Sequence, residues 1–534
     1  WYNTQVSDST NINISGTLTG DLFGGAYQSY VKQSTNIITT GNLYGNIYGG
    51  GENTSSGTSG VGYKQNSEFI SGIININIKT GTIGNKNTSN NIYGGSKNQN
   101  NIDTDKFEEN SYITIGSTEG SPIIYNTIYG GGINDKLNST NIEVIGNNRN
   151  SYLKIYGASN ANSVIKTSNI TTNGGYIAEI YGSGNTVGSV DTTNITLDRS
   201  TVQNVYGAGN RNSAKITNII AKSGNITNIY GGGKDLDTAI ENTNISVLNG
   251  NITNIYGAGL NNGAGRTNIN VNASTRTSRI TNIYGGAKDS GNVNETNVNI
   301  LNGSVNNVYG GNQNGGYTIN SKVNIQKTAE VKNKLFAGGQ NSDIGTSGTN
   351  GNAILNITGG TISCDVNGGS DLGKVYGNTF VNIGKEVAQI EAEKINSGNI
   401  NIQGDIFGGG TSEYSQYKLQ YDNSQTSEYN FDKVTSVEGN SNINIDGKST
   451  ITFANNIYGT GNASTYSGTS NITIENFGIQ KNVKEIKSIQ RASNLYIGNS
   501  WLEIDGKQDI LSASNRASYS LNKIDSVTLY KASA

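Results

Sequence analysis

Apolar and polar residues alternate in short stretches that recur through most of the chain. Thr10-Asn11-Ile12-Asn13-Ile14 places apolar side chains at every second position, which is typical of a strand with one buried face. Comparable Thr-Asn-Ile strands begin at Thr35, Thr193 and Thr217. No long stretch keeps the 3.6-residue period of an amphipathic helix, and Gly, Asn and Thr are poor helix formers. The pattern therefore predicts an all-β chain of many short strands.

A second phrase, Asn-Ile-Tyr-Gly-Gly-Gly at 228–233, recurs with small changes. There are 14 copies, with the aromatic residue at positions 23, 48, 93, 129, 156, 181, 206, 230, 256, 284, 309, 336, 407 and 458. Successive gaps from position 156 to position 336 are 25, 25, 24, 26, 28, 25 and 27 residues. A period of that length indicates a solenoid, in which each repeat packs only on its neighbours.

The two phrases keep a constant distance within each repeat. Thirteen residues separate Thr35 from Tyr48, and the same step joins Thr217 to Tyr230. The return stretch to the next strand varies in length and carries the large polar insertions, near 52–71, 96–110 and 411–440. Constant spacing predicts strands stacked in register, and variable spacing predicts exposed loops.

These features predict a single-stranded parallel β-helix (β-solenoid), right-handed, with roughly 16–20 coils of about 25 residues. The repeat array covers 1–477, with degenerate coils in 337–406, where Lys385 to Lys394 suggests a short helical or turn insertion. Residues 478–534 are more charged and contain different strands. We expect this C-terminal part to be a cap on the last coil or a bridge to a following segment.

A corner is expected at the Asn of the second phrase. Val202 and Val205 are three residues apart, so a strict strand would point them to opposite faces. A left-handed corner at Asn204 would turn both inward, since Asn tolerates that conformation; Thr127, at the same place in its coil, fits this interpretation least. Stacking would then align the Asn amides into a hydrogen-bonded column: Asn204, Asn228, Asn254, Asn282 and Asn307.

The aromatic residue that follows would point outward, with a small residue after it for close backbone packing. The aromatics would stack from coil to coil at the strand spacing of about 4.8 Å. One interpretation is structural, with the rings covering the coil corner. The other is an exposed contact strip that binds sugar rings or another subunit, made of Tyr48, Tyr93, Tyr129, Tyr156, Tyr181, Tyr206, Tyr230, Tyr256, Tyr284 and Tyr309.

Composition narrows the function classes. Charged residues are 14% and the net charge is −2, which gives no reason to expect a nucleic-acid partner. No run of 18 apolar residues occurs, so membrane insertion is not expected. The chain has no His and one Cys, Cys364, which we expect to pack as a small hydrophobe. The abundance of Asn, Thr, Ser and Gly favours an extracellular or cell-surface location.

No catalytic, cofactor-binding or metal-binding residue is assigned from the sequence. The paired carboxylates Asp103 with Asp105 and Asp235 with Asp237 fall in predicted loops, where charge is ordinarily solvated. A general acid–base pair requires two carboxylates that converge in space, and adjacent coils are able to supply one. Gly232 to Asp237 resembles calcium-binding nonapeptides in part, so an isolated calcium site stays open, but no array of such sites is expected.

The alternation of Thr-Asn-Ile-x-Ile with Gly-x-Ile-x-Asn-Ile-Tyr-Gly-Gly-Gly resembles the repeats of large adhesin-like surface proteins of anaerobic Gram-positive bacteria. More loosely, it resembles right-handed parallel β-helices such as autotransporter passengers and pectate lyases. The resemblance covers about 1–477. It implies a secreted or surface protein with a glycan or matrix partner, and it supplies no catalytic residue that matches a position of this chain.

The sequence thus leads to two hypotheses. The first is a non-catalytic extracellular structural rod that acts as an adhesin, a stalk or a self-assembling fibre subunit. Its partners would be other copies of itself, joined end to end or laterally, or a host or matrix glycan or protein. The alternative is a glycan-binding or polysaccharide-degrading β-helix enzyme. A cleft with two carboxylates and a basic residue would favour the alternative.

Overall fold

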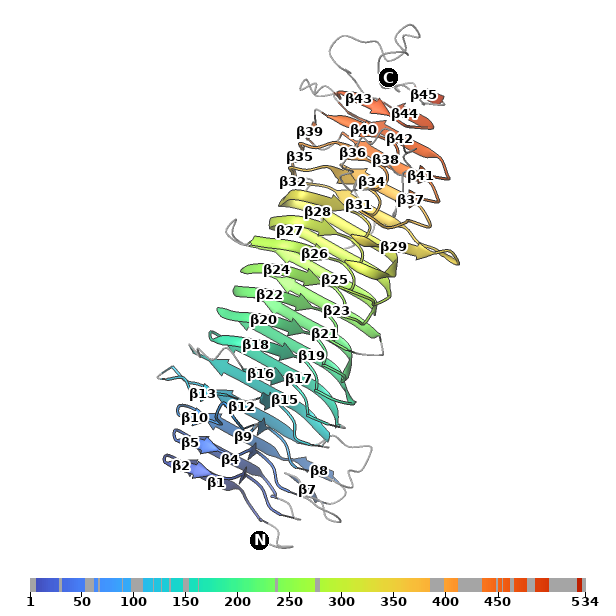
Figure 1. Cartoon of the computed structure of the whole chain (residues 1–534). Coiled ribbons are helices and arrows are strands. Elements are labelled where there is room, and N and C mark those ends of the chain that lie inside the picture. Colours follow the sequence, from blue (N-terminus) through green and yellow to red (C-terminus); the bar gives the residue numbers. More distant parts are fainter. Residues whose placement is uncertain are drawn as a thin grey trace, which may run out of the picture. The chain divides into compact units, whose positions relative to one another are not determined.

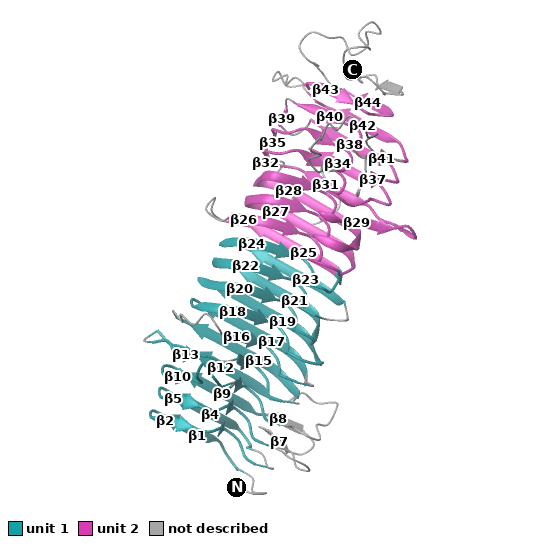
Figure 2. Cartoon of the chain, in the orientation of Figure 1, with its two compact units in different colours: residues 1–265 teal, residues 266–534 magenta. Residues whose placement is uncertain are grey.

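The computed structural model shows a chain of strands joined by short turns, with no helix among the residues it describes. Compact packing divides the chain into unit 1, Trp1–Gly265, and unit 2, Arg266–Ala534 (Figure 2). The structure describes every residue except 1–5, 28–30, 53–61, 66–67, 89, 98–108, 119, 126, 134–135, 147–152, 162, 236–238, 274–278, 385–397, 412–434, 448–449, 454, 462–464, 478–485, 499–525 and 531–534.

Unit 1 contains two main columns of parallel strands (Figure 1). The first column stacks the Thr-Asn-Ile strands: β1 (Thr10–Ile14), β4 (Ser34–Thr39), β9 (Ile73–Ile78), β12 (Asn110–Ile115), β15 (Lys136–Ile145), β17 (Ser163–Asn173), β19 (Gly188–Asp198), β21 (Ser213–Ala221) and β23 (Ile240–Val247). The second column stacks strands that end at the aromatic residue: β3 (Leu22–Phe23), β6 (Ile47–Tyr48), β11 (Ile92–Tyr93), β14 (Thr127–Tyr129), β16 (Lys154–Tyr156), β18 (Tyr176–Tyr181), β20 (Ser200–Tyr206), β22 (Gly224–Tyr230) and β24 (Asn251–Tyr256).

The early coils of unit 1 carry a third, shorter column. It comprises β2 (Thr17–Thr19), β5 (Asn42–Tyr44), β10 (Thr82–Ile83) and β13 (Ile123–Ile124). An antiparallel hairpin, β7 (Gly62–Gln65) with β8 (Glu68–Ser71), lies inside the predicted insertion 52–71. That insertion is therefore not loop alone, because its described part pairs with itself.

Unit 2 continues the same two kinds of strand. Its strands are β26 (Arg279–Tyr284), β27 (Val293–Tyr309), β28 (Asn314–Phe336), β29 (Asn341–Thr346), β30 (Thr349–Asn350), β31 (Ala353–Ile357), β32 (Gly360–Ile362), β33 (Val366–Asn367), β34 (Thr379–Ile383), β35 (Ile400–Ile402), β36 (Ile406–Phe407), β37 (Ser436–Val437), β38 (Ser441–Asp446), β39 (Ile451–Phe453), β40 (Asn456–Tyr458), β41 (Thr465–Tyr466), β42 (Ser470–Glu475), β43 (Ser488–Gln490), β44 (Asn494–Gly498) and β45 (Ser526–Tyr530), with most of β25 (Ala264–Asn272). In β27 and β28 the two columns merge into single long strands. The insertion predicted at Lys385 to Lys394 and most of 411–440 lie outside the described residues.

Pairing within each unit joins like to like. β1 pairs with β4 so that Thr10 lies beside Thr35, and β20 pairs with β22 so that Tyr206 lies beside Tyr230. Successive turns are about 26 residues apart. The predicted parallel β-solenoid is therefore confirmed, and the constant step between the two phrases does correspond to strands in register.

The core is a narrow column of Ile, Val and Leu. In the coil of β19 and β20, Ile195, Leu197, Val202 and Val205 are all buried, with at most 1% of each exposed. Burying such a side chain contributes roughly 1.5–3 kcal/mol. The prediction that Val202 and Val205 both point inward is confirmed.

The predicted left-handed corner at Asn204 is wrong. Asn204 lies inside β20, and it is not among the described non-glycine residues with positive φ, which are Arg199, Lys327, Asn476 and Arg491. The in-register pairing passes over Gln203, which lies between the two inward valines. The left-handed residue comes earlier in the coil, as at Gly224 and Gly250, with φ of 116° and 115°. Because the Asn position is extended, Thr127 and Lys154 are accommodated there as well.

A buried hydrogen bond ties the two phrases together. The Thr35 hydroxyl donates to the carbonyl of Gly49, and Thr217 donates to Gly231, at 2.6 Å in both cases and 14 residues along the chain. In unit 2, Thr296 donates in the same way to Gly310. A buried carbonyl without a donor costs about 1–3 kcal/mol. This bond is a physical reason for the constant spacing in the sequence.

No helix among the described residues is long and apolar enough to cross a membrane.

Replacing Thr217 with Val tests the buried hydroxyl. Thr217→Val keeps the shape of the side chain and removes the donor to Gly231, so the free energy of unfolding should fall by about 1–3 kcal/mol. Urea unfolding measures the change. Thr196→Val is the matched control, because Thr196 faces outward and its register neighbour in the next coil is already Ile220. An equal effect of both substitutions would contradict the assignment.

Replacing Gly207 with Ala tests the close approach of successive coils. An added Cβ would lie 2.1 Å from the Gly231 carbonyl oxygen and 2.8 Å from the Thr217 Cβ. Backbone would have to move, so Gly207→Ala should destabilise the chain by about 1–3 kcal/mol or more. Gly16→Ala is the control, since nothing lies within 4 Å of a Cβ there. Equal melting temperatures of wild type and Gly207→Ala would contradict the close approach of successive coils at Gly207.

Candidate functional site

The aromatic residues form continuous stacks within each unit. In unit 1, successive ring centroids are 4.5–5.1 Å apart and the planes differ by only 3–11°, from Phe23 through Tyr48, Tyr93, Tyr129, Tyr156, Tyr181, Tyr206 and Tyr230 to Tyr256. In unit 2, Tyr284, Tyr309 and Phe336 stack at 5.1 and 5.4 Å, and Phe407 stacks on Tyr458 at 4.7 Å. Asn367 occupies the register position between Phe336 and Phe407 and interrupts this stack.

The rings are not an exposed strip. All ten tyrosines of the predicted contact strip, from Tyr48 to Tyr309, are only 1–6% exposed. The rings between Phe23 and Tyr256 have a ring stacked on each face, and two hydroxyls of unit 2 meet a turn of a later coil. The Tyr284 hydroxyl bonds to Gln340 at 3.1 Å, and the Tyr309 hydroxyl donates to Asp371 at 3.3 Å. The geometry therefore corrects the exposed interpretation and supports the structural one.

Burial also changes the acidity of these hydroxyls. It raises the pKa of Tyr284 from 10.0 to about 12. For Tyr156, burial and the nearby Glu179 carboxylate together raise the pKa to about 12. Burial raises the pKa of Tyr181 and Tyr206 as well. These four tyrosines are therefore neutral over the whole range of physiological pH.

The predicted Asn column is present. Asn228 donates to Asn204 and Asn254 donates to Asn228, both at 2.8 Å, and in unit 2 Asn307 donates to Asn282 at 2.7 Å. A second amide column, which sequence reasoning did not identify, follows the Asn of the Thr-Asn-Ile strands. Its bonds are 2.9–3.0 Å long in the run Asn141, Asn169, Asn194, Asn218 and Asn244. The constant Asn after Thr or Ser was the signal for it.

Two charged residues on the strands have a residue of opposite charge beside them in the next coil. Lys154 and Glu179 occupy, in adjacent coils, the position that Asn204 has in its coil, and they lie 2.8 Å apart. Asp191 of β19 and Lys215 of β21, which precede the Thr-Asn-Ile phrase within these strands, lie 2.7 Å apart. Each of these pairs links two successive coils.

The structure also brings two carboxylates together that the sequence did not single out as a pair. Asp365 and Asp405 lie side by side in consecutive coils of unit 2, each just before the apolar residue of the second phrase. The Asp405 backbone N–H donates to the Asp365 carboxylate at 2.9 Å, and Asn456 donates to Asp405 at 2.9 and 3.0 Å. Burial, reinforced by the charge of Asp405, raises the pKa of Asp365. Burial also raises the pKa of the adjacent Cys364 thiol to about 12, so it is not a thiolate at neutral pH.

The acidic residues that the sequence singled out in predicted loops form no carboxylate pair among the described residues. Asp235 accepts a hydrogen bond from Asn261 at 3.1 Å and so joins a column of amides. Asp103, Asp105 and Asp237 lie outside the described residues. Where the structure describes the chain, no group of three or more His, Cys, Asp or Glu side chains is placed to hold a metal ion.

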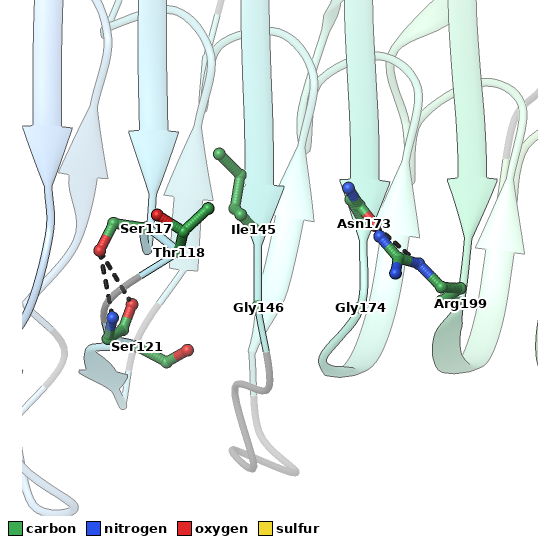
Figure 3. Close-up of a pocket in the computed structure, with 9 residues that line it drawn as sticks. Ser117, Thr118, Ser121, Ile145, Gly146, Asn173, Gly174 and Arg199 are labelled. Atoms are coloured by element: carbon green, nitrogen blue, oxygen red, sulfur yellow. Dashed lines mark hydrogen bonds between the residues drawn. The ribbon is translucent and has the colours of Figure 1, made fainter.

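A groove of about 510 Å³ lies across four successive coils of unit 1 (Figure 3). One wall is the loop between β12 and β13, where Ser117 N–H donates to the Gly120 carbonyl at 2.9 Å. The floor follows the ends of β15 and β17, at Gly146 and Gly174. Arg199, just after β19, forms the opposite wall. The groove is lined by Ser117, Thr118, Gly120, Ser121, Ile145, Gly146, Asn173, Gly174 and Arg199.

The Arg199 side chain lies back over the groove toward the preceding coil (Figure 3). Its Nε donates to the Asn173 side-chain oxygen at 3.0 Å, and a terminal nitrogen donates to the same oxygen. The neighbouring Asp198 carboxylate instead accepts from Ser223 of the next coil at 2.5 Å. The groove was not predicted; a positively charged residue at a glycine position, Arg199 beside Gly174 in register, was the available signal.

Comparison with known proteins adds no assignment: no family model, no curated protein and no solved structure matches this chain.

The buried tyrosines predict a loss of stability in alkali. Their pKa is 10.0 when exposed and higher when folded, so the unfolded chain loses protons first as pH rises. Their contribution to stability is complete below about pH 10 and declines as pH rises toward 12 and beyond. Because the chain has 30 tyrosines and some of them are exposed, only part of the tyrosinate absorbance should rise together with the loss of far-UV circular dichroism, in one cooperative transition. Tyr156→Phe should make the decline shallower. Complete ionisation near pH 10 with native dichroism would contradict buried hydroxyls.

Proposed function

We propose that this chain is a non-catalytic structural rod of the extracellular space or the cell surface, of the stalk or fibre type. The main support for the proposal is that the repeated side chains contact their own counterparts in neighbouring coils. The tyrosines stack on one another, the asparagines bond to one another, and the threonine hydroxyls bond to buried glycine carbonyls. A repeat whose constant residues serve coil-to-coil contact is suited to building length, since each added coil is stabilised by its neighbour.

Composition supports the location. The chain has no His, one Cys and only 14% charged residues. Other copies of the same chain are the first partner we propose, since parallel strands at the end of a solenoid pair readily with another strand edge. A matrix glycan or protein is the second. The proposed location is tested on intact cells, and the proposed self-association is tested on the purified chain.

The polysaccharide-degrading alternative has one specific observation in its favour. It would use Asp365 and Asp405, which occupy neighbouring coils, with the pKa of Asp365 raised. A raised carboxyl pKa is a common property of general acids. Against this use, one oxygen of each carboxylate already accepts a backbone N–H from the following coil, as the amides do elsewhere in the column. We therefore favour the structural role for this pair.

The decisive measurements are surface labelling and product formation. Antibodies against the purified chain should label intact producing cells, and electron microscopy should show elongated particles that join end to end or side by side. Incubation with acidic and neutral polysaccharides should release no fragments. Labelling that requires permeabilised cells would refute the location, and uniformly isolated particles would refute assembly. Polysaccharide cleavage that disappears in Asp365→Asn, with the fold retained, would establish the enzyme instead.

A further inference from the structure

We propose that unit 1 pairs side by side with unit 1 of a second copy of the chain, running antiparallel, through a row of four alternating charges: Lys166, Asp191, Lys215 and Glu241. The row gives the proposed self-association a specific surface, and it rests on that part of the proposed function. The four residues lie in the consecutive strands β17, β19, β21 and β23 (Figure 1). At the usual strand spacing the row is about 14 Å long.

Strand pairing places the four charges at one position of successive coils. In the β17–β19 and β19–β21 pairings, the residues on both sides of this position lie beside each other, so Lys166, Asp191 and Lys215 share it. The β21–β23 pairing begins one residue later and puts Lys215 beside Glu241. The Lys215 ammonium lies 2.7 Å from the Asp191 carboxylate. The hydrogen bond and charge of Asp191, with a smaller contribution from Glu241, raise the pKa of Lys215, as expected for a lysine with a carboxylate on either side.

Neutral residues bound the row at both ends. Asn138 has the same position in the coil before Lys166. Gly265 has it in the coil after Glu241, since a Cβ on Gly265 would lie 2.7 Å from the Glu241 carbonyl oxygen. The row is therefore a limited set of two positive and two negative charges, in the order plus, minus, plus, minus.

Such a row is complementary to itself. A two-fold axis between Asp191 and Lys215 reverses the order of the charges in the second copy, and contacts with two-fold symmetry are the commonest between identical chains. Lys166 then faces Glu241 of the second copy, Asp191 faces Lys215 of the second copy, and each contact occurs twice. Two copies that run parallel in the same register would instead set like charge against like charge, which is unfavourable.

The charged side chains are able to bind a second partner. The side chains of Lys215 and Asp191 remain 61% and 51% exposed although they contact each other, and the other two residues of the row are exposed as well. An ammonium has three donors, and a carboxylate accepts several hydrogen bonds. Ser189 and Ser213, two residues before Asp191 and Lys215, are short, so they leave the longer charged side chains accessible to another molecule.

Two single charge reversals test the contact by mutual rescue. Lys215→Glu places a carboxylate opposite Asp191 of the second copy, and Asp191→Lys places an ammonium opposite Lys215 of the second copy. Each variant alone should therefore pair at least about tenfold more weakly than wild type. In an equimolar mixture every charge of one variant faces an opposite charge of the other, so pairing should return to about the wild-type strength. Sedimentation velocity of the full chain measures the dissociation constants.

Salt and a matched variant serve as controls. Wild-type pairing should weaken at least about tenfold between about 0.1 M and 1 M NaCl, because the Debye length falls from about 10 Å to 3 Å. Lys332→Glu changes the net charge by the same amount as Lys215→Glu. Lys332 is 43% exposed and lies 3.5 Å from Glu330 of its own strand, outside the row, so this variant should pair like wild type. Recovery in the mixture is not a folding effect, because each chain keeps its own substitution.

A zero-length carbodiimide crosslink tests the direction of the two chains. Within one chain Lys166 and Glu241 are three coils apart, about 14 Å, so a direct amide between their side chains forms only between two copies that run antiparallel. Mass spectrometry of wild-type pairs should detect this crosslink, and its yield should fall in Lys215→Glu.

Four results would overturn the proposed surface: no wild-type pairs, equal pairing of Lys215→Glu and wild type, no recovery in the mixture, or no crosslink between Lys166 and Glu241. Particles that join end to end and are unaffected by either reversal would overturn this surface and leave the structural rod intact. A failure of antibodies to label intact cells would instead contradict the location of the rod and leave the pairing surface intact.

Discussion

Stacking in register at about 4.8 Å is the constraint on which the rest of this structure depends. When coils repeat at that spacing, each side chain meets its own counterpart above and below. A residue type is therefore acceptable at a given place only if it tolerates its own copy. Tyrosine does so by parallel stacking, with centroids 4.7 Å apart at Tyr206 and Tyr230, and asparagine does so because its amide both donates and accepts. The repeated phrases of the chain are the residues that meet this condition.

A charged side chain is unfavourable beside its own copy, because like charges repel one another. This explains why charged residues are few and why a charge is placed beside the opposite charge in the next coil. A lysine beside a glutamate satisfies it, as at Lys154 and Glu179, whereas like charges in register repel one another. Asp365 and Asp405 are an exception. Each accepts a backbone N–H from the coil that follows, and burial, with the charge of Asp405, raises the pKa of Asp365. The columns thus favour a weakly charged chain for reasons of stability.

The same constraint separates structural residues from residues that are available for binding. Side chains that recur in every coil are used by their neighbours, and the tyrosines, which are the most prominent feature of the sequence, prove to be nearly inaccessible. Departures from the repeat are more informative about function. The enlarged loop at Ser117 and the arginine at a glycine position, Arg199, are both departures, and together they wall the groove. In a solenoid of this kind, irregular positions are where a specific contact is able to evolve without disturbing the stack.

The sequence by itself determined the period, the strand positions, the register and the inward faces, because these follow from local alternation and from spacing along the chain. It also determined which residues stack, since in-register copies must meet. Only the tertiary structure decided which residues shield each column of stacked side chains from solvent. Whether Tyr284 is exposed depends on Gln340, which reaches it from a later coil. The chain turns at Gly224 rather than at Asn228 because buried neighbours hold the Asn strand extended. The pairing of Asp365 with Asp405 and the groove between Ser117 and Arg199 both join residues that variable loops separate along the chain. The length of such a loop does not fix the distance between its ends in space.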